Sequence, residues 1–513
     1  MLGLRKLRFV DIGTGLSMML GTAGMLAASA LAVADDCTTS SASCTQAAPQ
    51  CCDGIFADAA ARMQGLYNGL SSDGCACPPA SCAPSASSCS STAGGCGSTC
   101  GSGSCFGSGF LLNSKGEPLT LTDLFDDPCG NNHLKDNGWK LGGNLAQSYT
   151  WNFNNPANRY NGPVTWTDQS DQYQLNQFWL YAEKATDTSK KDWDFGGRAD
   201  FLYGTSARLT TESGLETPHL NGPGTYGLAI PQFYGEVAYK KLKIKTGHFI
   251  SPIGYQTVDT TQNFFSTIPY TYQWGEPFTH TGAMATYQFS DAFVASAGVI
   301  KGWDNFAGDN GHLGYLGTYS YTFKDKSNIT LVNLLTQEPN FAFNFSQRYY
   351  QSLVYTKPID DNWTYVAQSD FGTQRDATVN GQRANWYGFN NYLFRKINDH
   401  WTWGINGEWW RDEEGYRVAG FLPGTAPSGI TGRPNGVPLS VLPGGYAGNF
   451  YQVTVGPRWY PTGKPNFFVR PSARFDWYQG QYDTTVNPNG VRPFGDGNKT
   501  TQALFITDVC ITF

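Results

Sequence analysis

The sequence predicts an all-β protein, a transmembrane antiparallel β-barrel of about 16 strands (range roughly 12 to 18), behind a mostly irregular N-terminal segment rich in Cys, Ser and Gly. Three observations point to this fold class. The chain begins with an export signal, residues from about 139 onward alternate polar and apolar with a period of two, and the last residue is aromatic. An exported chain that enters a membrane without a long apolar helix does so as a closed barrel.

Composition agrees with strands that have one wet face. Aromatic residues make up 15% of the 513, charged residues another 15%, and Gly is frequent with 60 copies. The formal charge of -6 is mild and there is no basic tract, so we expect no nucleic-acid partner.

Residues 1–34 have the three parts of a secretory signal. Arg5, Lys6 and Arg8 form a basic start, an apolar stretch follows, and Ala32 and Ala34 flank Val33. We predict cleavage after Ala34 and export to the outer membrane of a diderm bacterium. A membrane anchor helix is the alternative, but the apolar run is short and interrupted by Gly.

Residues 35–130 form a low-complexity segment that holds most of the cysteines. Eleven of the 13 lie between Cys37 and Cys105, Cys129 follows, and the last is Cys510. In an exported protein this density predicts disulfides, and the odd total leaves at least one thiol free or bonded to a partner chain. Residues 53–69 could form a short helix within this segment.

Zinc bound by cysteines is the rival interpretation of this segment. Cys75 and Cys77 are two residues apart, and Cys96 and Cys100 are four apart. However, no His precedes His133 and the compartment is oxidising, so we expect disulfides and no metal.

Residues 131–513 are expected to form the barrel. In NFFVRPSARFDWY (466–478), for example, Phe467, Val469 and Phe475 fall on one face while Arg470 and Arg474 fall on the other. Sixteen such strands are predicted to begin near 139, 172, 193, 227, 240, 279, 291, 313, 327, 345, 362, 383, 399, 448, 464 and 500.

The connections between these strands alternate in length. Turns such as SKKD, YK, KDKS and PTGKP are tight, whereas the links at 249–278 and 413–447 reach about 30 residues. Short turns on one rim and long loops on the other are typical of an outer-membrane barrel, not of a soluble sandwich or propeller.

The C-terminus carries a separate signal for barrel assembly. Phe513 is in register with Ile511, Val509 and Phe505, so the last strand has one apolar face that ends in Phe. We interpret Phe513 as the residue that the barrel assembly machinery reads.

Several phrases in the middle of the chain are similar to a known family. The run GHFISPIGYQ (247–256), GEPFTHTG (275–282) and GWDN (302–305) resemble motifs of the bacterial OmpL-like outer-membrane β-barrel porins, with Gln256 in place of an acid. The resemblance covers roughly residues 139–513. It implies a transmembrane porin and names no substrate.

A barrel of this size is too wide for side chains to fill, so we expect a water-filled lumen lined by polar groups. A charged group on a strand that faced lipid would cost a few kcal/mol, so inward is the physical default. The alternation places eight charged residues on the lumen side: Lys243, Lys245, Asp370, Glu408, Arg458, Arg470, Arg474 and Asp476.

The link at 249–278 is the third long loop, which in sixteen-stranded general porins folds into the lumen. The position suggests the same here, with Asp259, Glu276 and His280 as constriction or loop-anchoring groups. Acidic loop groups opposite basic wall groups would create a transverse field in the pore.

The sequence therefore predicts an outer-membrane porin for passive diffusion of small hydrophilic solutes or ions. We expect no catalytic residues, because His280 and Glu276 lie at a loop end without further ligands, and we expect no cofactor. We expect the porin to contact outer-membrane lipid and the barrel assembly machinery and to form a homotrimer. Two alternatives stay open: a structural barrel that crosslinks the envelope through its cysteines, and a soluble carbohydrate-binding β-protein.

Overall fold

A computed structural model of the chain describes residues 111–112, 117–127, 131–212, 214–216, 225–307, 311–340, 344–378, 380–418, 446–480 and 492–513. The predicted signal sequence, the predicted helix at 53–69 and the cysteines before Cys510 lie outside these residues. No helix in the described ranges is both long and apolar enough to span a membrane.

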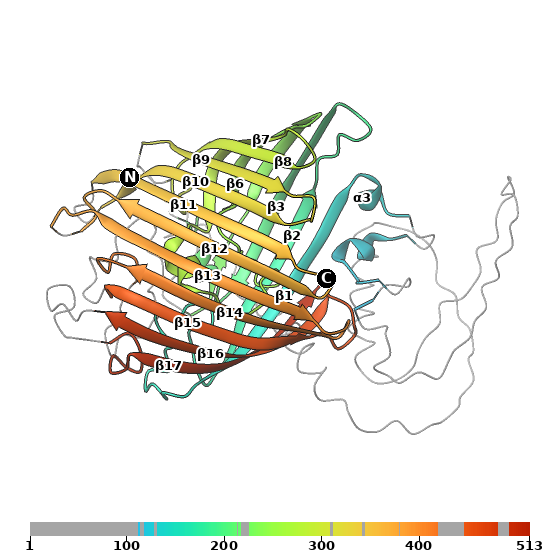
Figure 1. The fold of residues 1–513 in the computed structure, drawn as a ribbon. Coiled ribbons are helices and arrows are strands. Elements are labelled where there is room, and N and C mark those ends of the chain that lie inside the picture. Colours follow the sequence, from blue (N-terminus) through green and yellow to red (C-terminus); the bar gives the residue numbers. More distant parts are fainter. Residues whose placement is uncertain are drawn as a thin grey trace, which may run out of the picture. The chain divides into compact units, whose positions relative to one another are not determined.

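The described chain is dominated by long strands (Figure 1). The strands are β1 (Trp139–Asn152), β2 (Tyr173–Lys184), β3 (Trp193–Gly204), β4 (Gly227–Ala229), β5 (Phe233–Tyr239), β6 (Leu242–Ile250), β7 (Thr279–Gln288), β8 (Phe293–Ile300), β9 (Gly314–Thr322), β10 (Asn328–Pro339), β11 (Phe345–Pro358), β12 (Trp363–Gln374), β13 (Ala384–Lys396), β14 (Trp401–Asp412), β15 (Gly448–Trp459), β16 (Phe467–Gly480) and β17 (Thr501–Thr512). Four short helical turns accompany them: η1 (Leu121–Phe125), α3 (His133–Asp136), α4 (Ala207–Thr210) and η2 (Thr271–Gly275).

The strands form one closed antiparallel barrel. Each pairs with its sequence neighbours, and the last strand returns to the first, with Leu145 opposite Ile511. Strands β4 and β5 both pair with β3, so they are two parts of one interrupted strand and the seventeen strands make a barrel of sixteen. Pro231 lies in the interruption, where its missing N–H cannot contribute to the ladder. The predicted fold class is confirmed.

The period-two pattern located the strands accurately. Each of the sixteen predicted starts lies within three residues of an observed start, and the largest difference is 464 against Phe467. The pattern gave no sign of the break between β4 and β5, because three residues without alternation resemble a bulge.

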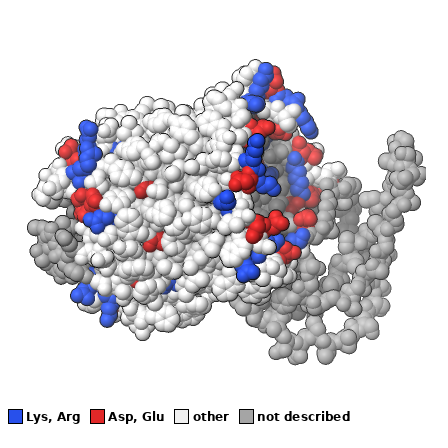
Figure 2. Space-filling model, in the orientation of Figure 1, with Lys and Arg blue, Asp and Glu red and all other residues white. Residues whose placement is uncertain are grey.

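The outer wall is apolar and the two rims are charged. Figure 2 shows Lys, Arg, Asp and Glu gathered at both ends of the barrel, with few of them on the band between. Aromatic side chains such as Phe389, Trp403 and Phe475 are exposed on this band, as expected of a surface that faces lipid.

One end of the barrel carries the short turns, the C-terminus and α3 (Figure 1). There η1 packs on β1: the Thr122 hydroxyl donates to the Leu141 carbonyl at 2.9 Å, and Asn132 donates to the Thr122 carbonyl at 2.7 Å. These bonds anchor the chain that precedes the barrel to its first strand.

Candidate functional site

The connection between β6 and β7, residues 251–278, folds into the barrel; we call it the inner loop. Most of its side chains are buried, and η2 within it packs against β12 and β13. The predicted third long loop is therefore inside the lumen.

Arg470 on β16 holds the start of the inner loop to the wall. Its Nη1 donates to the carbonyls of Thr260 at 2.8 Å and Asn263 at 2.6 Å, while its Nε donates to Asp508 Oδ1 at 2.9 Å. Arg458 on β15 also donates to the Asn263 carbonyl. A guanidinium has five donors in a fixed fork, so one side chain can bind the loop and neutralise a wall carboxylate together.

Arg474, four residues further along β16, repeats this arrangement. Its Nη1 donates to the Ile268 carbonyl at 2.6 Å and to Thr267 Oγ1 at 2.8 Å, and its Nε donates to Asp476 Oδ1 at 2.9 Å. Asp476 also accepts the Tyr270 hydroxyl at 2.8 Å. The basic wall groups thus meet the loop through its carbonyls, not through its carboxylates as the transverse-field hypothesis assumed.

Glu408 on β14 binds the next part of the inner loop. Its carboxylate accepts the backbone N–H of Tyr270 at 2.7 Å, that of Thr271 at 2.6 Å and the Thr271 hydroxyl at 2.7 Å. Asn390 on β13 donates to the same hydroxyl at 2.8 Å. Hydrogen bonds to an ionised acceptor are about twice as strong as neutral ones, which makes Glu408 the main anchor of η2.

Glu276 lies at the far end of the inner loop against β12. Gln368 Nε2 donates to Glu276 Oε1 at 2.7 Å and also donates to Asp370 Oδ2, so one amide links the two carboxyl groups. Gly254 makes this approach feasible, since a Cβ there would lie 2.2 Å from a Glu276 carboxylate oxygen. The sequence predicted that Glu276 lies on a loop inside the lumen, but it did not predict Gln368 as its partner.

A row of polar side chains links these anchors across the wall. Directly paired positions from β12 to β17 are Gln368, Asn390, Glu408, Gln452, Asp476 and Gln502. The four amides are not among the residues predicted from the sequence, although each follows the inward phase of the alternation in its strand. The signal that identifies them is their position opposite one another on neighbouring strands.

Lys243 and Lys245 on β6 lie on a part of the wall for which no direct contact with the inner loop is seen. The Lys243 side chain is 43% exposed and its Nζ is 3.7 Å from Glu236 Oε1, whereas the Arg474 side chain is fully buried. Lys245 Nζ lies 4.2 Å from the Tyr234 ring centroid. Arg198 on β3 and Glu183 on β2, whose side chains are 3.4 Å apart, are also partly exposed.

Asp259 and His280 stabilise the inner loop at two places. Asp259 accepts from Asn144 on β1 at 3.0 Å and from Thr261 within the loop. His280 is buried on β7, where Nδ1 donates to the Gly302 carbonyl at 2.9 Å and Nε2 is 3.1 Å from the Ser251 hydroxyl. His280 thus ties the end of the loop to its beginning and does not border the lumen centre.

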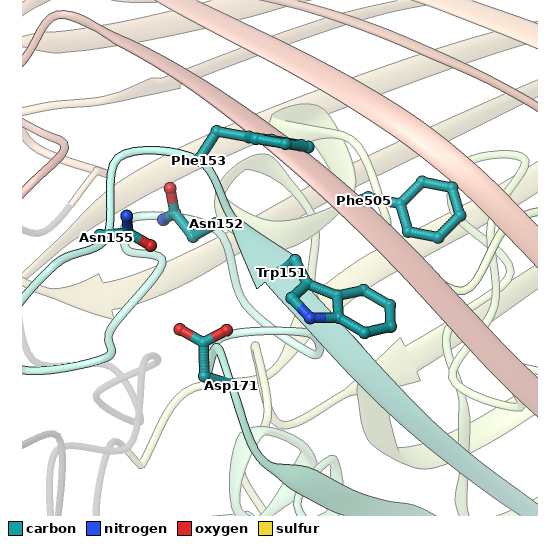
Figure 3. A pocket seen from close by; sticks show the side chains of 6 residues that line it. All are labelled: Trp151, Asn152, Phe153, Asn155, Asp171 and Phe505. Atoms are coloured by element: carbon teal, nitrogen blue, oxygen red, sulfur yellow. The ribbon is translucent and has the colours of Figure 1, made fainter.

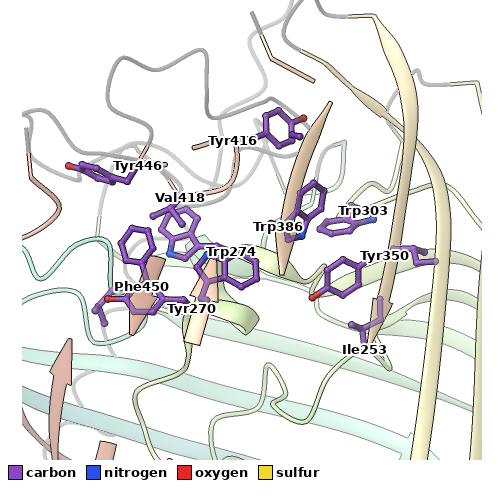
Figure 4. Close-up of a cluster of buried hydrophobic side chains, with 14 of the residues drawn as sticks. Ile253, Tyr270, Trp274, Trp303, Tyr350, Trp386, Tyr416, Val418, Tyr446 and Phe450 are labelled. Atoms are coloured by element: carbon purple, nitrogen blue, oxygen red, sulfur yellow. The ribbon is translucent and has the colours of Figure 1, made fainter. Parts of the chain in front are cut away.

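The lumen is less polar than the alternation predicted. Buried aromatic side chains of β11, β13, β14 and β15 meet those of the inner loop, among them Tyr350, Trp386, Trp410, Phe450 and Trp274 (Figure 4). The prediction of a lumen lined by polar groups did not include these inward aromatic groups of the wall, for which the inner loop provides a dry surface to pack on.

Arg417, beyond the end of β14, reaches this aromatic cluster. Its Nε donates to the Trp274 carbonyl at 2.7 Å, and its guanidinium lies about 5 Å from the ring centroids of Trp303 and Trp386. This role could not be predicted, because Arg417 belongs to a long connection without periodicity.

Cys510 is a free thiol, buried on the inner face of β17 3.3 Å from Arg470 Nη2 and Asp508 Oδ2. The other twelve cysteines lie outside the described residues, so the predicted disulfides stay a prediction. We expect Cys510 to resist a membrane-impermeant maleimide in the folded protein and to react fully after denaturation, as measured by peptide mass mapping. Full labelling of the folded protein would contradict this burial.

Within the described ranges, no group of three or more His, Cys, Asp or Glu is arranged to hold a metal ion. A closed sixteen-stranded barrel with an apolar outer band and a loop docked inside it has the architecture of an outer-membrane porin. The chain belongs to the family described as "Putative beta-barrel porin-2, OmpL-like", whose model matches residues 138–513. The resemblance drawn from the sequence is confirmed.

No curated protein matches the chain. Among solved structures, OprB of Pseudomonas putida is 13% identical with a TM-score of 0.46, covering 74% of this chain and 95% of that one. An anion-selective porin from Comamonas acidovorans is 8% identical with a TM-score of 0.46, covering 73% and 99%. OmpF of Salmonella typhi, in complex with daunomycin, is 11% identical with a TM-score of 0.44, covering 74% and 99%.

Proposed function

We propose that the protein is a pore for passive diffusion of small hydrophilic solutes or ions, narrowed by the inner loop. The observation that carries this proposal is the docking of that loop on Arg470, Arg474 and Glu408. These bonds fasten one flank of the loop to β14 and β16, while Gln177 on β2 bonds Val258 and Thr260 on its other flank. The partly exposed charged groups of β2, β3 and β6 are proposed to line the remaining solute path. Membership of the porin family supports a channel.

Planar-bilayer recording of the purified mature protein tests the pore. Discrete ohmic conductance steps are expected, since a water-filled tube conducts in proportion to voltage. The absence of steps over several preparations of protein with heat-modifiable gel mobility would favour a structural barrel.

The exposed Lys243 and the half-buried Lys245 are proposed to set the ion preference. Replacing both by Glu exchanges two positive for two negative charges in the solute path, so reversal potentials in a KCl gradient should shift toward cation selectivity. The matched control is Lys190→Glu with Lys396→Glu, two exposed rim lysines, which should leave the reversal potential unchanged. Equal behaviour of both double variants would contradict a path along β6.

We also propose the finer features expected from the sequence: cleavage after Ala34, disulfides within residues 35–130, and recognition of Phe513 by the barrel assembly machinery. A disulfide-linked partner through the N-terminal segment belongs to the same proposal. Nonreducing gels and N-terminal sequencing of the exported protein test these points.

A homotrimer is proposed on a feature of the outer wall. Asn333 and Gln351 pair across β10 and β11 beside Tyr349, whose hydroxyl lies 2.9 Å from both side-chain carbonyl oxygens. Amide groups on a lipid-facing wall lack water to bind, so a neighbouring protein surface would stabilise them. Crosslinking in native membranes should give trimers.

A further inference from the structure

The outer wall has a groove at the end that carries the short turns. It is lined by Tyr321 and Phe323 of β9 and its turn, by Tyr355 of β11, and by Lys324, Asp325 and Ser327, and it has a volume of about 570 Å³. We propose that this groove binds one anionic glycerophospholipid of the periplasmic leaflet. The proposal concerns the wall and is independent of conduction through the pore.

The floor and walls of the groove follow from the strand register. Ile329 on β10 pairs with Tyr321 on one side and Tyr355 on the other, so two aromatic ridges flank a smaller side chain. Because neighbouring strands are about 4.8 Å apart, the ridges stand about 10 Å apart. This trough is wide enough for one acyl chain.

The trough continues from the turn toward the middle of the wall. Leu331, the next outward residue of β10, lies between Tyr319 and Leu353. The first part of an acyl chain that enters beside Tyr321 therefore lies on Ile329 and Leu331, between aromatic and aliphatic side chains, as its hydrocarbon requires.

The mouth of the groove can bind a lipid phosphate. Lys324 lines it, and Lys357, the outward residue after Tyr355, has its Nζ 3.6 Å from Asp325 Oδ2. Asp325 is held in place by Ser327, whose N–H and hydroxyl both donate to Oδ1. These hydrogen bonds and the Lys357 charge lower the pKa of Asp325, so one negative charge opposes two positive ones and the mouth favours an anion.

A second groove at the opposite rim provides a contrast. It is lined by Trp151, Asn152, Phe153, Asn155, Asp171 and Phe505, with a volume of about 330 Å³ (Figure 3). It has aromatic walls but no Lys or Arg among its lining residues, so it has no cation for a phosphate. Aromatic residues alone are typical of barrel rims, whereas the basic mouth distinguishes the first groove.

The test measures lipid retention by the mature full-length protein in detergent, using native mass spectrometry. The probes are dioleoylphosphatidylglycerol and dioleoylphosphatidylcholine, which share acyl chains and differ in head-group charge. We expect preferential retention of the phosphatidylglycerol by wild-type protein. Each lysine near a membrane surface strengthens anionic-lipid binding about fivefold. The double variant Lys324→Ala with Lys357→Ala should therefore lower the preference for phosphatidylglycerol by about 25-fold or abolish it.

Two further variants separate the head-group and chain contacts. Tyr321→Ala with Tyr355→Ala should weaken retention of both lipids, because it removes the ridges and leaves the charges. Lys190→Ala with Lys396→Ala, on other turns of the same rim, should retain lipid as wild type does. Equal retention of the two lipids by wild-type protein, or equal loss in both lysine double variants, would mean nonspecific annular lipid and would overturn the proposal.

Folding and conduction controls keep these outcomes distinct. Every variant should show wild-type heat-modifiable mobility, and the lysine variants should show wild-type conductance because their side chains lie outside the barrel. A wild-type protein that binds the lipid selectively yet does not conduct would contradict the proposed pore and leave the lipid site standing.

Discussion

Replacing Glu408 by Ala should release η2 from the barrel wall and raise single-channel conductance by about twofold or more, because conductance grows with the open cross-section. The substitution removes the acceptor of two backbone N–H groups and one hydroxyl of the inner loop. A buried donor left without its partner costs about 1 to 3 kcal/mol, so several together would detach the turn. Added current noise from the mobile loop should accompany the larger steps.

Two matched variants make this result specific to the anchor. Glu408→Gln keeps one acceptor oxygen without the charge and should give an intermediate conductance. Glu183→Ala removes a carboxyl group that bonds Arg198 and should leave step size near wild type while altering selectivity. If Glu408→Ala and Glu183→Ala gave the same conductance, the inner loop would not be the structure that narrows the pore.

Replacing Arg470 by Met should lower the free energy of unfolding by about 3 to 5 kcal/mol, the usual effect of leaving a buried charge without its partner. Arg470 and its ion-pair partner Asp508 are almost fully buried, and Arg470 also donates to two carbonyls of the inner loop. Reversible denaturant titration in phospholipid vesicles measures the change.

The double variant Arg470→Met with Asp508→Asn separates the charge from the loop contacts. Removing the orphaned carboxylate should recover a large part of the lost stability, because the penalty comes from the unpaired ion. The remainder reports the bonds to Thr260 and Asn263. Arg395→Met, at a turn-side position beside Trp363, should change the stability little, and an equal loss there would contradict the role assigned to Arg470.

The direction in which each wall residue faces could be predicted residue by residue. Period-two alternation put Arg470, Arg474 and Asp476 on the inner face, and the structure places all three there. It succeeded because neighbouring positions of a strand point to opposite faces and only one face meets lipid.

The partners of those residues could not be predicted from the sequence. The transverse-field hypothesis puts Glu276 opposite the basic wall groups. In the structure Glu276 lies beside Gln368 and Asp370, more than 90 positions away in the chain. Nothing in the sequence indicated the role of Arg417, and Trp303 belongs to the family motif GWDN, which does not show its partners. Both lie on connections where no periodicity restricts direction. The direction of a loop side chain depends on which groups it can pack against inside the barrel, and not on a period-two repeat.

By itself, the sequence determined the closed barrel, the strand starts, the short-turn and long-loop ends and the inward charges, since these depend on local alternation and the need to bond every backbone group in lipid. Only the tertiary structure decided that the inward groups of β12 to β16 hold the inner loop, that aromatic residues fill part of the lumen, and that Lys243 remains accessible. These features depend on which distant residues meet across the barrel, and a long loop can meet many of them before packing selects one arrangement.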